Sequence, residues 1–93
     1  MGVRPVEVLL LTQADCAFCH DAEEILERLS AEYGFAITIL DLETLEGRET
    51  AVRGGILFPP GILIDREPFS YGRPSERKLR KEFERRRKLL RRS

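Results

Sequence analysis

Two cysteines, Cys16 and Cys19, are the residues whose type and spacing most clearly predict chemistry. The thiolate is the form of cysteine that attacks a disulfide, whereas a free thiol with a pKa of about 8.5 is mostly protonated at neutral pH. Residues three apart on a helix have Cβ atoms roughly 5–6 Å apart, and a disulfide needs about 3.5–4.5 Å. A slightly tightened first turn would therefore let these two cysteines form a reversible disulfide.

The position of the pair gives each cysteine its own expected role. We place Cys16 where a strand ends and a helix begins, because unpaired N–H groups and aligned peptide dipoles there favour a negative charge. Cys19 then lies one turn further on, as the buried resolving thiol that attacks the mixed disulfide. Asp15 is adjacent and Asp21 lies in the next turn. We therefore predict only a moderate lowering of the Cys16 pKa.

Other uses of the same two thiols remain open. They can be inert core residues, or they can bind zinc or an iron–sulfur cluster shared between two chains; a four-cysteine zinc site within one chain would need a second pair. The segment from Cys16 to His20 also matches the haem-attachment pattern C-x-x-C-H. Methionine as the second axial ligand would have to be Met1, the only methionine, which argues against haem. We expect His20 to be an exposed polar residue.

Strands and helices alternate in the first half of the chain. The segment 6–12 is short and almost entirely apolar, as in a strand buried on both faces. We expect Asp15 to cap the following helix and Gly34 to end it. Segment 35–42 is a second predicted strand, and the helical crossover makes the pair parallel. The apolar stripe of the helix consists of Phe18, Ala22, Ile25, Leu26, Leu29 and Tyr33.

The sequence of the second half of the chain predicts a short helix over 45–52, a third strand at 62–64 and a fourth strand near 69–71. Pro68 cannot donate to a ladder, so the fourth strand belongs at an edge. Ser75 caps a basic C-terminal helix over about 75–92, whose expected inward residues are Leu79, Phe83 and Leu90. The predicted order is βαβαββα.

Length and charge limit the remaining possibilities. The 93 residues suit a single domain, 1–93, and 42% hydrophobic residues suffice for one modest core. Residues 75–93 hold ten Lys or Arg against three Glu, whereas residues 15–49 hold ten Asp or Glu against two Arg. We expect the basic C-terminal helix to be solvated, and we do not expect nucleic acid as a partner. We also expect a monomer. Neither a membrane span nor a secretory signal is evident, so we expect a reducing, cytoplasmic setting.

The segment 12–19, followed about forty residues later by 60–65, resembles the glutaredoxin-like branch of the thioredoxin superfamily. The resemblance implies a thioredoxin-like α/β fold, with a mixed four-stranded sheet flanked by helices. It also implies that Pro60 is a cis-proline beside the active disulfide. In an alternative register Pro59 is the cis residue and Phe58 precedes it.

What the resemblance implies is a thiol–disulfide oxidoreductase acting on protein or small-molecule disulfides, with Cys16 attacking and Cys19 resolving. Phe18, Pro59 and Pro60 would form an apolar substrate-binding rim, and no cofactor is needed. Two positions depart from the pattern: Gln13 replaces a lysine that meets a glutathione carboxylate, and Ala17 replaces a proline. Glutathione is therefore only a weakly supported electron donor. The alternative is a metal- or iron–sulfur-binding module that uses the same two thiolates.

Overall fold

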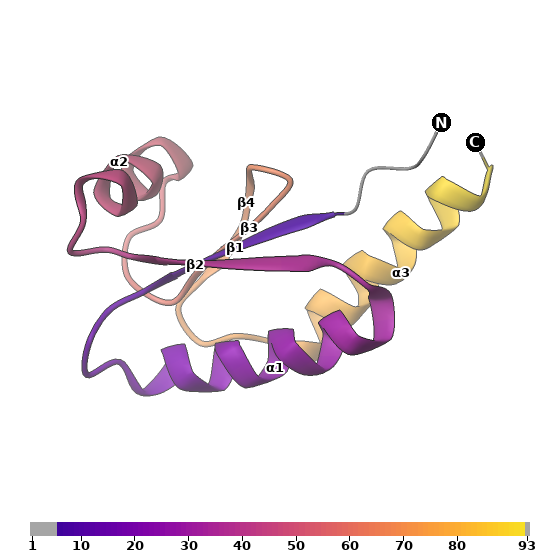
Figure 1. The fold of residues 1–93 in the computed structure, drawn as a ribbon, viewed down its shortest axis with the longest axis horizontal. Coiled ribbons are helices and arrows are strands. Elements are labelled where there is room, and N and C mark those ends of the chain that lie inside the picture. The colour runs from indigo at the N-terminus through magenta and orange to yellow at the C-terminus, as the bar shows by residue number, and fades with distance from the viewer. Residues whose placement is uncertain (1–5, 93) are drawn as a thin grey trace.

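A computed structural model describes residues 6–92, and the side chains up to residue 89. Three helices and four strands follow one another along this part of the chain in the predicted βαβαββα order (Figure 1). The elements are β1 (Glu7–Thr12), α1 (Ala17–Tyr33), β2 (Ala36–Asp41), α2 (Leu45–Gly54), β3 (Gly61–Ile64), β4 (Glu67–Tyr71) and α3 (Glu76–Arg92).

The four strands form one mixed sheet in the order β2-β1-β3-β4. β1 and β2 are parallel, as their helical crossover predicts, whereas β3 runs antiparallel to both β1 and β4. Pro68 lies on the edge strand β4, opposite Leu63, where the register shifts. The predicted edge position of this proline is therefore confirmed, and the missing N–H interrupts no central ladder.

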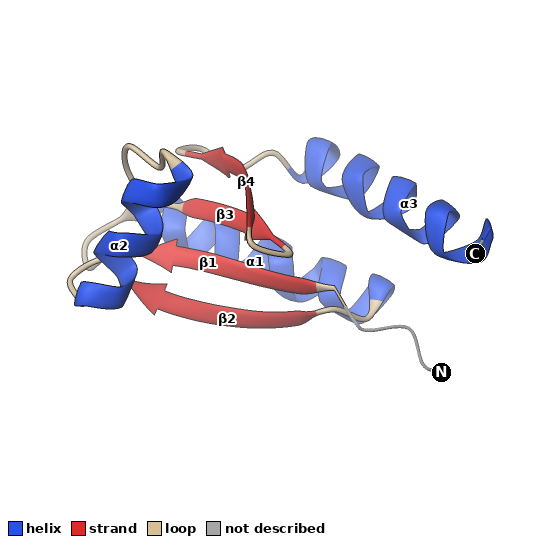
Figure 2. Ribbon diagram, turned by 90° about the horizontal axis from the view of Figure 1, so that it is seen from above, coloured by secondary structure: helices blue, strands red, loops and turns tan. Residues whose placement is uncertain are grey.

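Helices cover both faces of the sheet (Figure 2). α1 and α3 pack on one face around the larger core cluster, and the smaller cluster lies beneath α2. The larger cluster contains Val8, Leu10, Ala22, Leu26, Leu29, Phe35, Ile62, Ile64, Leu79 and Phe83. Leu79 and Phe83 thus point inward as predicted, whereas the Leu90 side chain lies outside the described residues.

Capping residues mark the ends of α1 and the start of α3. Gly34 ends α1 with φ 74°, and its N–H donates to the Ser30 carbonyl. Ser75 caps α3 as predicted, because its Oγ accepts from the Lys78 N–H at 3.2 Å. The expected cap by Asp15 is wrong: Cys16 is the N-cap residue of α1, and no side chain caps that end. Asp15 has φ 59°, outside the extended region that a capping residue normally occupies.

A network of ion pairs ties α1 to α3. Arg28 donates to Glu76 at 2.7 Å, and Arg80 donates to Glu32 at 2.6 Å and to Glu76 at 3.4 Å. The guanidinium of Arg28 lowers the pKa of Glu76, and that of Arg80 lowers the pKa of Glu32. These pairs are solvent-accessible, so they orient the two helices more than they stabilise them.

This network predicts a pH dependence of stability. Both carboxyl pKa values lie below the ordinary 4.5 in the folded chain. The contribution of the two ion-paired carboxylates to the free energy of unfolding is therefore complete well above pH 4.5. It is lost as the pH falls through the folded-state values. We expect the unfolding temperature of the wild type to fall more steeply below about pH 4.5 than that of Glu76→Gln. Thermal unfolding followed by circular dichroism measures this, with Glu27→Gln on the exposed side of α1 as the control. Equal slopes in wild type and Glu76→Gln would contradict the prediction.

Candidate active site

Cys16 and Cys19 are joined by a disulfide at the start of α1, and their Cα atoms are 5.3 Å apart. Cys16 has the extended backbone of an N-cap residue, and its carbonyl accepts a hydrogen bond from the Cys19 N–H at 3.2 Å. A bond between residues three apart is the tighter 3₁₀ pattern. The tightened first turn that the spacing required is therefore present, and the predicted pairing is confirmed.

The two cysteines differ in their access to solvent. Cys16 is half-buried at the end of the helix, whereas Cys19 is only 6% exposed. α1 has no acidic residue in its first turn and no side-chain cap, so the helix N-terminus retains its partial positive charge for an anion. The arrangement suits a thiolate at Cys16 that meets a visiting disulfide, with a second thiol held behind it.

The loop before β3 lies at the same end of the sheet as the disulfide. Gly61 is paired with Leu11 near the end of β1, the strand that leads to Cys16. The peptide bond between Pro59 and Pro60 is cis, which confirms Pro60, and not Pro59, as the cis-proline. Pro60 is buried and its carbonyl accepts from the Gly72 N–H at 2.9 Å. Of this proline pair, the half-buried Pro59 has the more accessible side chain.

Aromatic side chains surround this end of the molecule. Phe18, between the two cysteines, is 44% exposed, so its predicted place in the core stripe of α1 is wrong. Phe58, directly before the prolines, is 54% exposed and meets the Tyr71 ring edge-on, with 5.1 Å between ring centroids. A Cβ at Gly72 would come within 2.8 Å of the Phe58 ring. Glycine at that position therefore leaves room for the aromatic side chain.

Relatives of this chain are called thioredoxins. It is 31% identical over 75 residues to a probable thioredoxin of Archaeoglobus fulgidus, a match that spans 81% of this chain and 82% of the relative. The chain belongs to the thioredoxin superfamily. A probable thioredoxin of Methanothermobacter thermautotrophicus is 27% identical over 74 residues, which cover 80% of this chain and 87% of that protein. No protein-family model matches the chain.

Solved structures confirm the thioredoxin-like fold. A mutant thioredoxin from Halobacterium salinarum superposes with a TM-score of 0.68 at 22% identity, over 85% of this chain and 72% of that one. A thioredoxin-like protein from Clostridium perfringens gives a TM-score of 0.70 at 17% identity, over 86% of this chain and 69% of that one. This chain is thus a thioredoxin-like protein with a Cys16–Cys19 pair at disulfide distance.

The fold brings Arg73 close to the cysteine motif, although no sequence motif marks this residue as part of the site. Its guanidinium carbon lies 6.0 Å from the centroid of the Phe18 ring, at the limit for a cation–π contact. The loop between β4 and α3 carries Arg73, and the pattern Gly72-Arg73-Pro74 before a helix was the available signal. Contact between such distant segments follows only from the fold.

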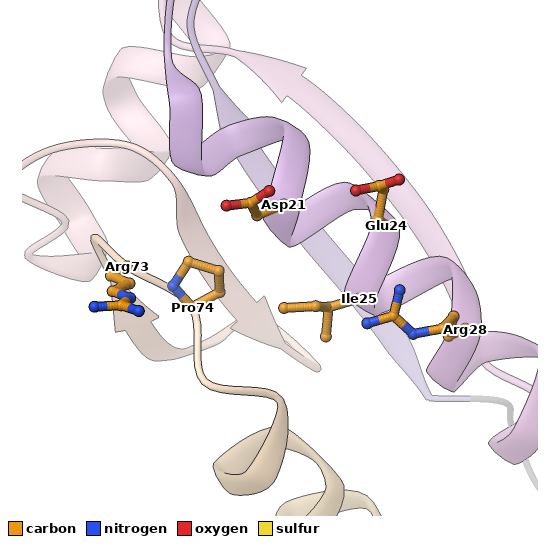
Figure 3. Close-up of a pocket in the computed structure, with 6 residues that line it drawn as sticks. All are labelled: Asp21, Glu24, Ile25, Arg28, Arg73 and Pro74. Atoms are coloured by element: carbon orange, nitrogen blue, oxygen red, sulfur yellow. The ribbon is translucent and has the colours of Figure 1, made fainter.

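A pocket of about 300 Å³ separates α1 from this loop (Figure 3). Asp21 and Glu24 stand on the α1 side, and Arg73 stands on the loop side. The remaining lining residues are Ile25, Arg28 and Pro74. His20 is exposed, as expected, and lies 3.8 Å from Glu24. The charges beside the cysteine motif are thus mixed.

Neither a metal site nor a membrane span is found within residues 6–92. Among them, no three His, Cys, Asp or Glu side chains are grouped so that they would hold a metal ion. None of the helices there has both the length and the apolar character needed to cross a bilayer.

Proposed function

We propose that this chain is a thiol–disulfide oxidoreductase that reduces or exchanges protein or small-molecule disulfides. The observation that carries the proposal is the disulfide between a half-buried Cys16 at a helix N-terminus and a buried Cys19. Membership of the thioredoxin superfamily supports it independently.

The reaction balances with the two thiols alone. The Cys16 thiolate attacks one sulfur of the substrate disulfide, forms a mixed disulfide and releases the other sulfur as a thiolate. The Cys19 thiolate then attacks the Cys16 sulfur, releases the second substrate thiolate and closes the Cys16–Cys19 disulfide. Two electrons pass from the chain to the substrate, and solvent protons neutralise the released thiolates. A dithiol donor returns the chain to its reduced form, so no cofactor is needed.

Accessible apolar surface near the disulfide supports a substrate-binding role for Phe18 and Pro59. Both side chains have exposed surface at the end of the sheet where the disulfide lies. Pro60 is buried, and we assign it the role of shaping the loop beneath the substrate. Because Pro59 has no N–H, only its carbonyl is available for backbone pairing with a bound peptide. We therefore propose that contacts with the apolar rim supply more of the binding energy than backbone pairing does.

Phe18→Ala tests this rim. We expect kcat/KM for a protein disulfide to fall about tenfold, mostly through KM, because truncating a central aromatic contact typically costs more than 1 kcal/mol. Turnover of a small disulfide should change far less, since it does not span the rim. Val52→Ala on the exposed face of α2 is the matched control. An equal loss with both substrates would instead assign Phe18 to the chemistry.

The electron donor and the glutaredoxin-like subtype are also part of the proposal. Gln13 in place of a lysine weakens the case for glutathione, and the relatives are called thioredoxins. Turnover of a generic disulfide should be measured with dithiothreitol, with glutathione and its reductase, and with thioredoxin reductase. Turnover with dithiothreitol above the Cys16→Ser background supports the proposed function, and its absence contradicts it. The two enzymatic systems then identify the donor class. A reducing, cytoplasmic setting and a monomeric state belong to the same proposal.

The metal- or cluster-binding alternative has less support. Two sulfurs supply only half of a four-ligand site, and no group of three or more His, Cys, Asp or Glu side chains that could hold a metal ion is found among residues 6–92. Metal analysis after anaerobic purification separates the two functions, since tightly held iron or zinc supports only the alternative.

A further inference from the structure

The cations of α3 divide into two groups by their contacts. Three arginines contact the body of the protein: Arg80 pairs with Glu32 at 2.6 Å, Arg86 pairs with Asp65 at 2.8 Å, and Arg87 donates to the Glu32 carbonyl at 3.2 Å. The lysines are exposed, and none of them has an ion pair or side-chain hydrogen bond with the described residues. These lysines are Lys78, Lys81 and Lys88. Among the described side chains, these three arginines thus make the polar contacts between the cations of α3 and the body, and the lysines make none.

The three lysines line one groove. With Arg85 they follow spacings of three and four, which place side chains on one side of a helix. They border a hollow of about 570 Å³ between α3 and β4, where Phe69 contributes a half-buried ring. We call these five residues, Phe69, Lys78, Lys81, Arg85 and Lys88, the lysine groove.

The carboxylates at the lysine groove are already engaged. Glu82 accepts from Arg85 at 2.6 Å and from Arg86 at 2.7 Å, and Glu84 accepts from the Tyr33 hydroxyl at 2.6 Å. Neither carboxylate forms an ion pair with a lysine of the groove, and the three lysines and Arg85 outnumber the two carboxylates that line the hollow. The groove presents positive charge around an apolar ring, although the whole chain has a formal net charge of zero.

The position of the groove relates it to the disulfide. α3 follows directly after the loop that carries Arg73, and Arg73 lies beside Phe18 in the cysteine motif. Lys78 lies in the first turns of α3, and the stretch from Lys78 to Lys88 extends about 15 Å along the helix at 1.5 Å per residue. An extended polypeptide of about five residues spans that distance. A flanking segment of about this length therefore covers the groove from Lys78 to Lys88.

We propose that the lysine groove binds an acidic segment of the partner protein whose disulfide is attacked by Cys16. The inference rests on the proposed function and adds a substrate class to it. Aspartate and glutamate side chains complement the lysines, and a neighbouring apolar side chain packs on Phe69. A nucleic acid fits less well, because the groove offers few cations for a run of phosphates.

Three peptides of equal length test the proposal. Each carries one cysteine as a mixed disulfide with thiopyridine and, after a short neutral spacer, a run of aspartates, asparagines or lysines. Release of thiopyridone gives kcat/KM by absorbance. For the wild type at low ionic strength we expect kcat/KM to be about tenfold higher for the aspartate peptide than for the asparagine peptide. The preference should disappear in about 0.5 M salt, where exposed charges are screened.

Two triple variants test whether the preference for the aspartate peptide depends on the lysine groove. In Lys78→Gln/Lys81→Gln/Lys88→Gln the aspartate-to-asparagine ratio should approach one, and the use of a ratio removes any general loss of activity. The matched control, Arg48→Gln/Arg53→Gln/Arg66→Gln, also loses three positive charges but away from the groove, and should keep the tenfold ratio. An aspartate-to-asparagine ratio of kcat/KM equal to one in the wild type would overturn the proposal. A tenfold ratio retained by the lysine variant would overturn it as well. Binding of an oligothymidylate that is lost in the lysine variant would assign the groove to nucleic acid and also overturn it. If even the asparagine peptide reacts no faster than with Cys16→Ser, the proposed function itself is wrong.

Discussion

Cys16→Ser is expected to abolish disulfide reduction, with a fall in turnover of about a thousandfold or more, because a serine hydroxyl is not ionised at neutral pH and cannot attack a disulfide. We propose that this sulfur makes the attack because Cys16 is half-buried at the uncapped end of α1, whereas Cys19 is buried. Steady-state turnover of a generic disulfide with dithiothreitol measures the loss. Ala14→Ser, which adds a hydroxyl at an exposed position beside the motif, should keep wild-type turnover.

Cys19→Ser should give a different defect. Cys16 still attacks, but no second thiol within the chain resolves the product, so the mixed disulfide accumulates. Mass spectrometry of the intact chain after one equivalent of substrate should show this adduct in Cys19→Ser and not in Cys16→Ser. Full activity of Cys16→Ser, or an adduct only in that variant, would reverse the roles.

Phe83→Ala is expected to lower the free energy of unfolding by about 3–5 kcal/mol, the usual cost of truncating a buried phenylalanine. The Phe83 side chain is only 3% exposed, and its ring stacks on Phe35 with 4.4 Å between centroids and on Tyr33 with 5.8 Å. It is therefore a main apolar contact between α3 and the rest of the larger core. Urea unfolding monitored by circular dichroism measures the change.

Leu89→Ala is the matched control on the same helix. The Leu89 side chain is 52% exposed, so its truncation should cost less than about 1 kcal/mol. Similar losses in the two variants would mean that α3 does not pack through Phe83.

The order of elements was predictable because each has a local signal. The apolar run of β1, the three-and-four spacing in α1 and the conformational freedom of Gly34 all act within a few residues of the structure that they specify. The edge position of Pro68 was predictable for a similar reason, since a missing N–H is a property of the residue itself. The disulfide pairing likewise follows from spacing on one helical turn.

Three features of the site were not predictable from local signals. Asp15 is a good capping residue by type, but the turn from β1 into α1 gives it a positive φ, and Cys16 takes the capping position. Phe18 has the spacing of a core residue, yet its side chain is exposed. The contact between Phe18 and Arg73 depends on how β4 and α3 pack against the sheet. Such contacts between distant segments are set by tertiary packing, which short-range patterns do not encode.

Competitive alkylation of the reduced chain shows which of the two cysteines is the accessible nucleophile. With less than one equivalent of iodoacetamide near neutral pH, followed by digestion and mass spectrometry, the label reports which sulfur is the accessible thiolate. We expect the label predominantly on Cys16. Predominant labelling of Cys19, or equal labelling of the two, would contradict this expectation.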